Sequence, residues 1–245
     1  MGILSQLKDT AVSALFPRRC PLCGGILRPN ERVCGSCSDE LVFIDRPICC
    51  LCGRPAYDCA CDGSVRYYER SVSPFVYTKS VRSGLHRLKF HNAPSVADFF
   101  SRFMAASVRR EYSNYHIDIV TSVPMYSADV NRRGYNQAAL LATGVGKALN
   151  IPVANNIVNK VVATNVQHTL PRAERMKNIH GAFEVIRPYS VRGKVVLLCD
   201  DIITTGYTLD ECARVIIKSG ADCVLCVTAA AVVSSSQQNV KRVYV

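Results

Sequence analysis

The stretch "LLCDDIITTGYTLDECARVI", residues 197–216, places two acids directly after an apolar run and follows them with a helical pattern. The run Val195–Cys199 predicts a buried strand, and apolar residues from 209 to 217 recur at the spacing of one helix face. We therefore expect Asp200 and Asp201 at the end of the strand. The turn into the helix then contains Thr204, Thr205, Gly206 and Thr208.

This turn has the chemistry of a phosphate site. The first backbone N–H groups of a helix are unpaired and lie at the positive end of the helix dipole. Threonine hydroxyls add donors, and Gly206 lets the backbone close around a small anion. The acids would repel phosphate, but carboxylates accept hydrogen bonds from vicinal hydroxyls and bind Mg²⁺. A sugar phosphate satisfies both halves, whereas an ordinary strand end before a capped helix would leave two adjacent acids repelling each other.

Strand and helix patterns alternate from about residue 66 onward. Strand patterns cover 73–80, 117–125 and 221–233, and helical patterns cover 80–90, 95–110 and 134–150. The alternation predicts an α/β fold with a mostly parallel sheet flanked by helices. Ligands bind such sheets at the carboxyl ends of the strands, where the loops after Val123, around 163–180 and after Cys199 should meet.

Nine of the thirteen cysteines lie between residues 20 and 61, mostly in Cys-x-x-Cys pairs. Two such pairs supply four thiolates, the ligand set of tetrahedral structural zinc. A redox motif or incidental thiols explain the pairing less well, because one redox motif would suffice. We expect one or two structural Zn²⁺ ions, held by Cys20, Cys23, Cys34, Cys37, Cys49, Cys52, Cys59 and Cys61.

Other cysteines do not fit this ligand pattern. Cys50 is a spare beside the second set. Cys223 and Cys226 share the Cys-x-x-Cys spacing but lie in a strand pattern, so their side chains should point to opposite faces. We expect them in the core.

Charge and hydropathy divide the chain unevenly. Residues 1–65 hold seven Lys or Arg and seven Asp or Glu, while 66–245 hold twenty-three against twelve and carry the whole net charge of +11. The excess serves either solubility or an anionic ligand, such as a polyphosphate or nucleic acid. We predict an N-terminal helix and double zinc ribbon over 1–65 and an α/β domain over 66–245. The N-terminal helix should dock on the protein or, as the weaker alternative, lie on a membrane surface.

No apolar run is long enough to span a membrane, and polar residues interrupt any secretion signal near the N-terminus. We therefore expect a cytoplasmic protein, in a compartment where thiols stay available for metal.

The segment "VVLLCDDIITTGYTL" resembles the phosphoribosyl pyrophosphate (PRPP) motif of type I phosphoribosyltransferases. With "FPRRCPLCGG", "PICCLCGRP", "LHRLKFHNAP", "SVPMYSADVNRRGYNQAALLA" and "VQHTLPRAERMKNIHGAF", the chain resembles the ComF family of competence proteins from about Phe16 to Val232. One departure is Thr121-Ser122, where an apolar or proline-bearing stretch is expected before the pyrophosphate loop.

The resemblance implies a role for each motif. Asp200 and Asp201 would be catalytic, binding the ribose hydroxyls and Mg²⁺, and the turn after them would bind the 5′-phosphate. The implied PRPP site comprises these acids with Ile202, Thr204, Thr205, Gly206, Tyr207, Thr208, Val123, Arg132, Arg133, Arg172 and Arg175. The arginines suit bidentate phosphate contacts or are ordinary surface charges.

Two functions follow as hypotheses. The first is a protein of DNA uptake and natural transformation that binds PRPP and single-stranded DNA and works with other competence proteins, such as a helicase-type or DNA-processing partner. Its expected DNA contacts are Arg82, Arg87, Lys89, Arg132 and Arg133. The second is a phosphoribosyltransferase that moves ribose 5-phosphate from PRPP to an unidentified acceptor.

Overall fold

The computed structural model describes residues 17–59, 61, 63, 65–90, 94–162, 179–187 and 190–234. The expected N-terminal helix, Arg172 and Arg175 lie outside the described residues. Among the helices that are described, none has the length and apolar character to cross a membrane.

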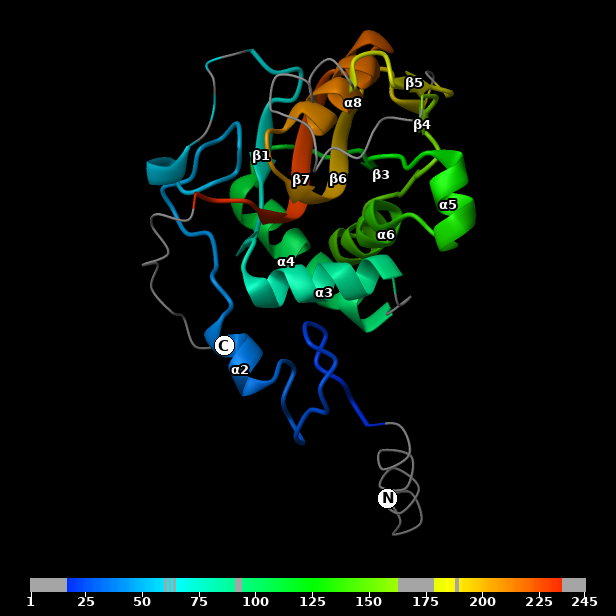
Figure 1. Ribbon diagram of the computed structural model, residues 1–245. Coiled ribbons are helices and arrows are strands. Elements are labelled where there is room, and N and C mark those ends of the chain that lie inside the picture. Colours follow the sequence, from blue (N-terminus) through cyan, green and yellow to red (C-terminus); the bar gives the residue numbers. More distant parts are fainter. Residues whose placement is uncertain are drawn as a thin grey trace.

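A five-stranded, fully parallel sheet forms the centre of the molecule (Figure 1). The long strands β6 (Val195–Ile203) and β7 (Cys223–Ala231) lie side by side in the middle. β3 (Ile119–Ser122) borders β6, while β1 (Arg70–Val72) and β2 (Phe75–Val76) both pair with β7. The predicted mostly parallel α/β sheet is confirmed.

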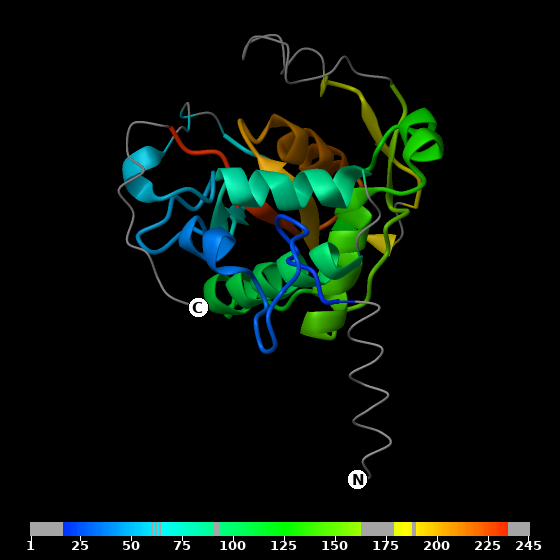
Figure 2. The same cartoon turned by 60° about the horizontal axis from the view of Figure 1, so that its bottom comes forward.

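Helices cover both faces of this sheet, as expected. α4 (Pro94–Glu111) and α6 (Gln137–Leu149) pack together on one face, and α8 (Tyr207–Lys218) packs on the other. Alternate residues of β6 supply the two cores: Leu197 and Cys199 face the α4–α6 layer, and Val196 and Leu198 face the α8 layer. α3 (Lys79–Phe90) lies against α4 and crosses below the strands in Figure 1 and in front of them in Figure 2.

Several elements differ from the sequence pattern. The strand predicted over 73–80 is only two residues long, because α3 already begins at Lys79. A short helix α5 (Ser127–Arg133) precedes α6, and Gly134, with φ +88°, ends it. The antiparallel pair β4 (Val158–Lys160) and β5 (Phe183–Val185) was not predicted either.

The cysteine-rich segment packs onto the α/β domain. α2 (Gly35–Asp39) and the 3-10 turn η1 (Ala56–Asp58) are its regular elements. The first ribbon, which carries Cys20, Cys23, Cys34 and Cys37, lies against α3 (Figures 1 and 2). Leu22 packs so closely on this helix that a Cβ at Gly84 would be 2.8 Å from the Leu22 Cδ2. Cys20, Leu22 and Leu41 therefore belong to the same core as the α4–α6 layer.

Candidate functional site

The two acids lie inside β6. The predicted strand end at Cys199 is wrong, because β6 continues to Ile203 along β7, with Asp200 opposite Thr228. β3 stops opposite Cys199, where Ser122 is its last paired residue. Beyond that point β6 has a paired neighbour on one side only, and Asp200 and Asp201 lie at this open edge. The apolar run 195–199 could not predict the longer strand, because residues 200–203 are held in β6 by hydrogen bonds to β7.

Both carboxyls are half-buried and close to each other. The Asp200 carboxylate accepts a hydrogen bond from the Asp201 backbone N–H at 2.9 Å. Burial raises the pKa of Asp200 well above its usual range, and the neighbouring Asp201 charge raises it further. Burial also raises the pKa of Asp201, while Lys89 lowers it. The pair is therefore held in an environment that favours a bound cation or hydroxyl donor.

The turn after β6 leads directly into α8. Gly206 is the N-cap of α8, with φ +79° and without a side-chain capping bond. A Cβ at Gly206 would lie 2.8 Å from the hydroxyl of buried Tyr68, so only glycine fits both the backbone angle and the space. The turn therefore brings its backbone to the start of α8, at the positive end of the helix dipole.

Strand edge, turn and helix start open into one cavity of about 1030 Å³. Of the residues expected at the PRPP site, nine line it: Val123, Arg133, Asp200, Asp201, Ile202, Thr204, Thr205, Gly206 and Thr208. The loop after β3 is held in place by Asn136, whose side-chain amide donates to the Val123 carbonyl at 2.9 Å. The acids and the threonine–glycine turn, adjacent in sequence, therefore share one concave surface with cations from α5 and α3.

Two expected PRPP residues point elsewhere. The Arg66 guanidinium lies over the Tyr207 ring, with the Arg66 Cζ 4.9 Å from the ring centroid. Arg132 is mostly exposed and forms an ion pair with Asp129 at 2.7 Å. Neither side chain lines the cavity. Arg132 and Arg133 are adjacent on α5, and the helix directs Arg133 into the cavity and Arg132 away from it.

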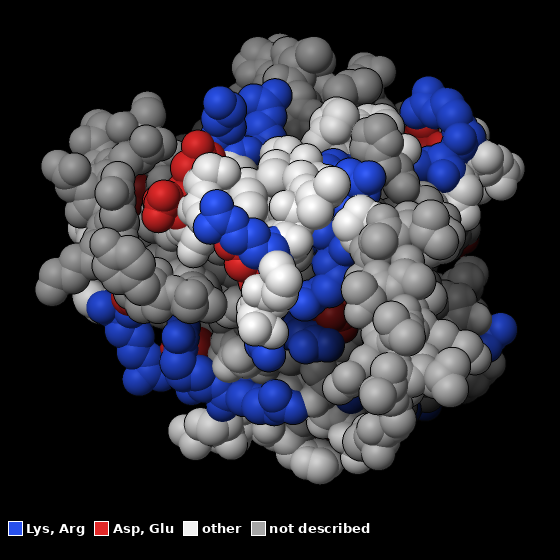
Figure 3. Space-filling view, turned by 90° about the horizontal axis from the view of Figure 1, so that it is seen from below, with Lys and Arg blue, Asp and Glu red and all other residues white. Residues whose placement is uncertain are grey.

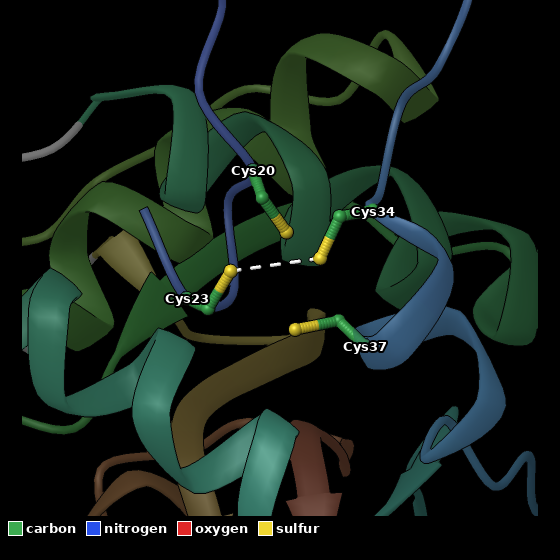
Figure 4. A group of neighbouring side chains, drawn as sticks. All are labelled: Cys20, Cys23, Cys34 and Cys37. Atoms are coloured by element: carbon green, nitrogen blue, oxygen red, sulfur yellow. Dashed lines mark hydrogen bonds between the residues drawn. The ribbon is translucent and has the colours of Figure 1, made fainter. Parts of the chain in front are cut away.

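The cysteines form two four-thiol groups. In each group the sulfur atoms lie within 4.8 Å of one another, and the members are the eight expected residues: Cys20, Cys23, Cys34 and Cys37, then Cys49, Cys52, Cys59 and Cys61. Figure 4 shows the first group converging on one centre, with Cys23 and Cys34 Sγ 3.6 Å apart. Zinc–sulfur bonds of about 2.3 Å in a tetrahedron fit this spacing. Both groups are structural Zn²⁺ sites, whereas Cys223 and Cys226 belong to β7, as expected.

Comparison with known proteins agrees with this architecture. Residues 11–67 match the double zinc ribbon domain family, and residues 102–245 match the phosphoribosyl transferase domain family. DNA utilization protein YhgH of Escherichia coli K12 is 30% identical over 78% of this chain and 87% of its own length. The chain belongs to the ComF family.

Other ComF relatives include Competence protein F of Haemophilus influenzae, 29% identical over 84% of this chain and 94% of that protein. Competence protein ComFC of Bacillus subtilis is 28% identical over 80% and 82%. The solved structure of Mycobacterium smegmatis phosphoribosylpyrophosphate synthetase aligns with 55% of this chain and 34% of its own at 18% identity. Its TM-score of 0.36 adds nothing to the assignment.

Five basic residues were expected to contact DNA in this ComF protein, and one of them, Arg132, is paired with Asp129 outside the cavity. Arg82, Lys89 and Arg133 line the cavity. Arg87 instead donates to the carbonyls of Cys20 and Pro21, at 2.7 and 3.3 Å, and so connects α3 to the first ribbon. On the face that carries α3 and the first ribbon, Lys and Arg side chains lie in several groups and not in one continuous stripe (Figure 3).

Sequence reasoning missed two cationic residues of the cavity. Lys160 lines it from β4, where burial lowers the pKa of its ammonium group while Asp129 and Asp200 raise it. Arg54 lines it from the second ribbon, which carries Cys49, Cys52, Cys59 and Cys61, and donates to the Thr204 carbonyl. Arg54 directly follows a Cys-x-x-Cys-Gly turn, but nothing in that local motif indicates contact with a residue 150 positions away.

Proposed function

We propose that this ComF protein binds PRPP with Mg²⁺ in the cavity and acts in DNA uptake by contacting single-stranded DNA at the cavity rim. One observation carries the proposal: the half-buried acid pair and the threonine–glycine turn line the same cavity as Lys160, Arg133 and Arg54. Vicinal hydroxyls, a phosphate and a pyrophosphate each find a chemical partner there.

Each part of the cavity is assigned a part of the ligand. The carboxylate oxygens of Asp200 and Asp201 suit both Mg²⁺, as metal ligands, and the ribose hydroxyls, from which they can accept hydrogen bonds. The N–H groups and hydroxyls from Thr204 to Thr208 suit a terminal phosphate. The backbone after Val123 and the ammonium of Lys160 suit the pyrophosphate, whose negative charge they offset.

The DNA role draws on the relatives, which are named for competence and DNA utilization. Arg82 and Lys89 on α3 provide cations for a DNA backbone, and Phe90 beside them is 55% exposed and available for base stacking. Since these residues line the same cavity, PRPP and single-stranded DNA should compete at the rim. The proposed partners are other competence proteins of the helicase or DNA-processing type. The proposed location is the reducing cytoplasm.

A transferase is the second candidate function, favoured by the cavity volume. The cavity of about 1030 Å³ extends from the acids to His86 and Phe90, which gives an acceptor a place beside the sugar phosphate. Release of pyrophosphate from PRPP in the presence of an acceptor base would establish this activity.

Two measurements test the proposal. The first is calorimetric titration of the protein with PRPP in the presence of Mg²⁺, and the second is fluorescence anisotropy of labelled single-stranded DNA titrated with the protein. The Asp200→Asn/Asp201→Asn variant should lose about 100-fold or more in PRPP affinity, because two charged acceptors become neutral. Asp222→Asn, exposed at the opposite end of β7, is the matched control and should bind like wild type. Wild-type protein that binds no PRPP would refute the ligand assignment, and DNA affinity independent of salt would refute the backbone contacts.

A further inference from the structure

Arg54 comes from the second zinc ribbon yet belongs to the phosphate end of the cavity. Its guanidinium Nη2 donates to the carbonyl of Thr204, in the turn that leads into α8. The residue is 7% exposed and lines the cavity together with Thr204, Thr205 and Gly206. A buried arginine is thus delivered to the turn by an element that the phosphoribosyl transferase match does not include.

The contact with Thr204 leaves part of the guanidinium unused. An arginine carries five N–H donors, and its Nε here is buried with no hydrogen-bond partner among the residues that the structure describes. Leaving a buried charged donor unpaired is costly, and an acceptor that enters the cavity would remove this cost. A phosphate accepts several such bonds at once from a planar guanidinium.

The zinc knuckle fixes the arginine in this position. The Arg54 carbonyl accepts from the Cys49 N–H at 2.8 Å, and the Cys49 carbonyl accepts from the Gly53 N–H at 2.9 Å. The knuckle is also joined to the sheet, because Ser71 N–H donates to the Cys50 carbonyl at 2.7 Å. Gly53, with φ +65°, allows this close approach, since a Cβ there would lie 3.0 Å from the Ser71 carbonyl.

We propose that Arg54 is a ligand-binding residue for the terminal phosphate of the sugar phosphate, and that the second zinc ribbon is therefore part of the binding site. The inference rests on the proposed function, because it assigns the phosphate to the turn after β6. The ribbon then has a role beyond folding: its thiols hold the knuckle that presents the arginine to the ligand.

The test compares Arg54→Gln and Arg54→Lys with wild type and with Arg28→Ala, an exposed arginine of the first ribbon. The probes are ribose 5-phosphate and pyrophosphate, each titrated into the protein in a calorimeter in the presence of Mg²⁺. Both Arg54 variants should weaken ribose 5-phosphate binding about 10- to 100-fold, which is the usual effect of removing one charged hydrogen-bond donor. Pyrophosphate affinity should stay within about twofold of wild type, as should both affinities of Arg28→Ala.

Thermal unfolding and zinc content separate a binding role from a purely structural one. Lysine can still donate to the Thr204 carbonyl, so Arg54→Lys should keep two zinc ions and a wild-type melting temperature while losing ribose 5-phosphate affinity. Unchanged ribose 5-phosphate affinity in either variant would overturn the inference, and so would an affinity loss seen only together with lost zinc or lower stability. Wild type that binds neither probe would instead refute the proposed function itself, and the inference with it.

Discussion

Replacing Gly206 by alanine should both destabilise the protein and impair the site. The residue has φ +79°, a backbone angle that costs an L-residue about 1–2 kcal/mol. Its new Cβ would also meet the Tyr68 hydroxyl at 2.8 Å, whereas ordinary contact begins near 3.4 Å. Tyr68 is 3% exposed and packed in the α8 core, so it cannot simply turn away.

The chain offers a control that separates these two effects. Gly193 has φ +65° but open space where a Cβ would be, so Gly193→Ala should cost only the backbone penalty. Gly206→Ala should cost that amount and about 1–3 kcal/mol more for overpacking. The melting temperature should fall by about 2–8 °C in the control and by clearly more in Gly206→Ala.

Urea denaturation of both variants, together with Tyr68→Phe and Tyr68→Phe/Gly206→Ala, provides the assay. Removing the hydroxyl should recover about 0.5–3 kcal/mol in the double variant, as a coupling between residues in contact. The reasoning is refuted if Gly206→Ala is no less stable than Gly193→Ala, or if Tyr68→Phe recovers nothing.

Three further outcomes are expected. Arg87→Ala should lower unfolding free energy by about 1.5–3 kcal/mol in urea, because two carbonyls of the first knuckle lose a charged donor, whereas exposed Arg82→Ala should change it by less than about 0.5 kcal/mol; equal effects would contradict this. Asp200→Asn should raise the melting temperature at pH 7, because a carboxyl whose pKa is raised by folding destabilises the folded state once the pH exceeds its unfolded pKa of about 3.9. The advantage of the variant should vanish below about pH 4. A lower melting temperature than wild type at pH 7 would count against the burial of this carboxyl. Stripping both zinc ions with a chelator should lower the unfolding midpoint by at least about 10 °C, and an unchanged midpoint in metal-free protein would contradict structural zinc.

Sequence patterns identified those features that local spacing determines. The eight thiol ligands were found because Cys-x-x-Cys turns bring two sulfurs together without help from the rest of the chain. The acid pair and Gly206 were found because a strand, a turn and a helix follow one another directly.

Features that depend on distant partners were missed. β6 extends past Cys199 because β7 continues beside it, whereas the two aspartates interrupt the apolar run before Ile202 and Ile203. Arg54 and Lys160 reach the cavity through tertiary packing, from a zinc knuckle and a short antiparallel strand. Arg87 was expected at a DNA surface, but its guanidinium is held by the first knuckle, since helix α3 turns it away from the cavity.

Amide hydrogen exchange across residues 200–210, with and without ribose 5-phosphate and Mg²⁺, examines the assigned phosphate site at its own backbone. If the turn holds the phosphate, the N–H groups from Thr204 to Thr208 should gain protection, while β7 and the first ribbon stay unchanged. Tight ribose 5-phosphate binding with no added protection in this segment would contradict the account.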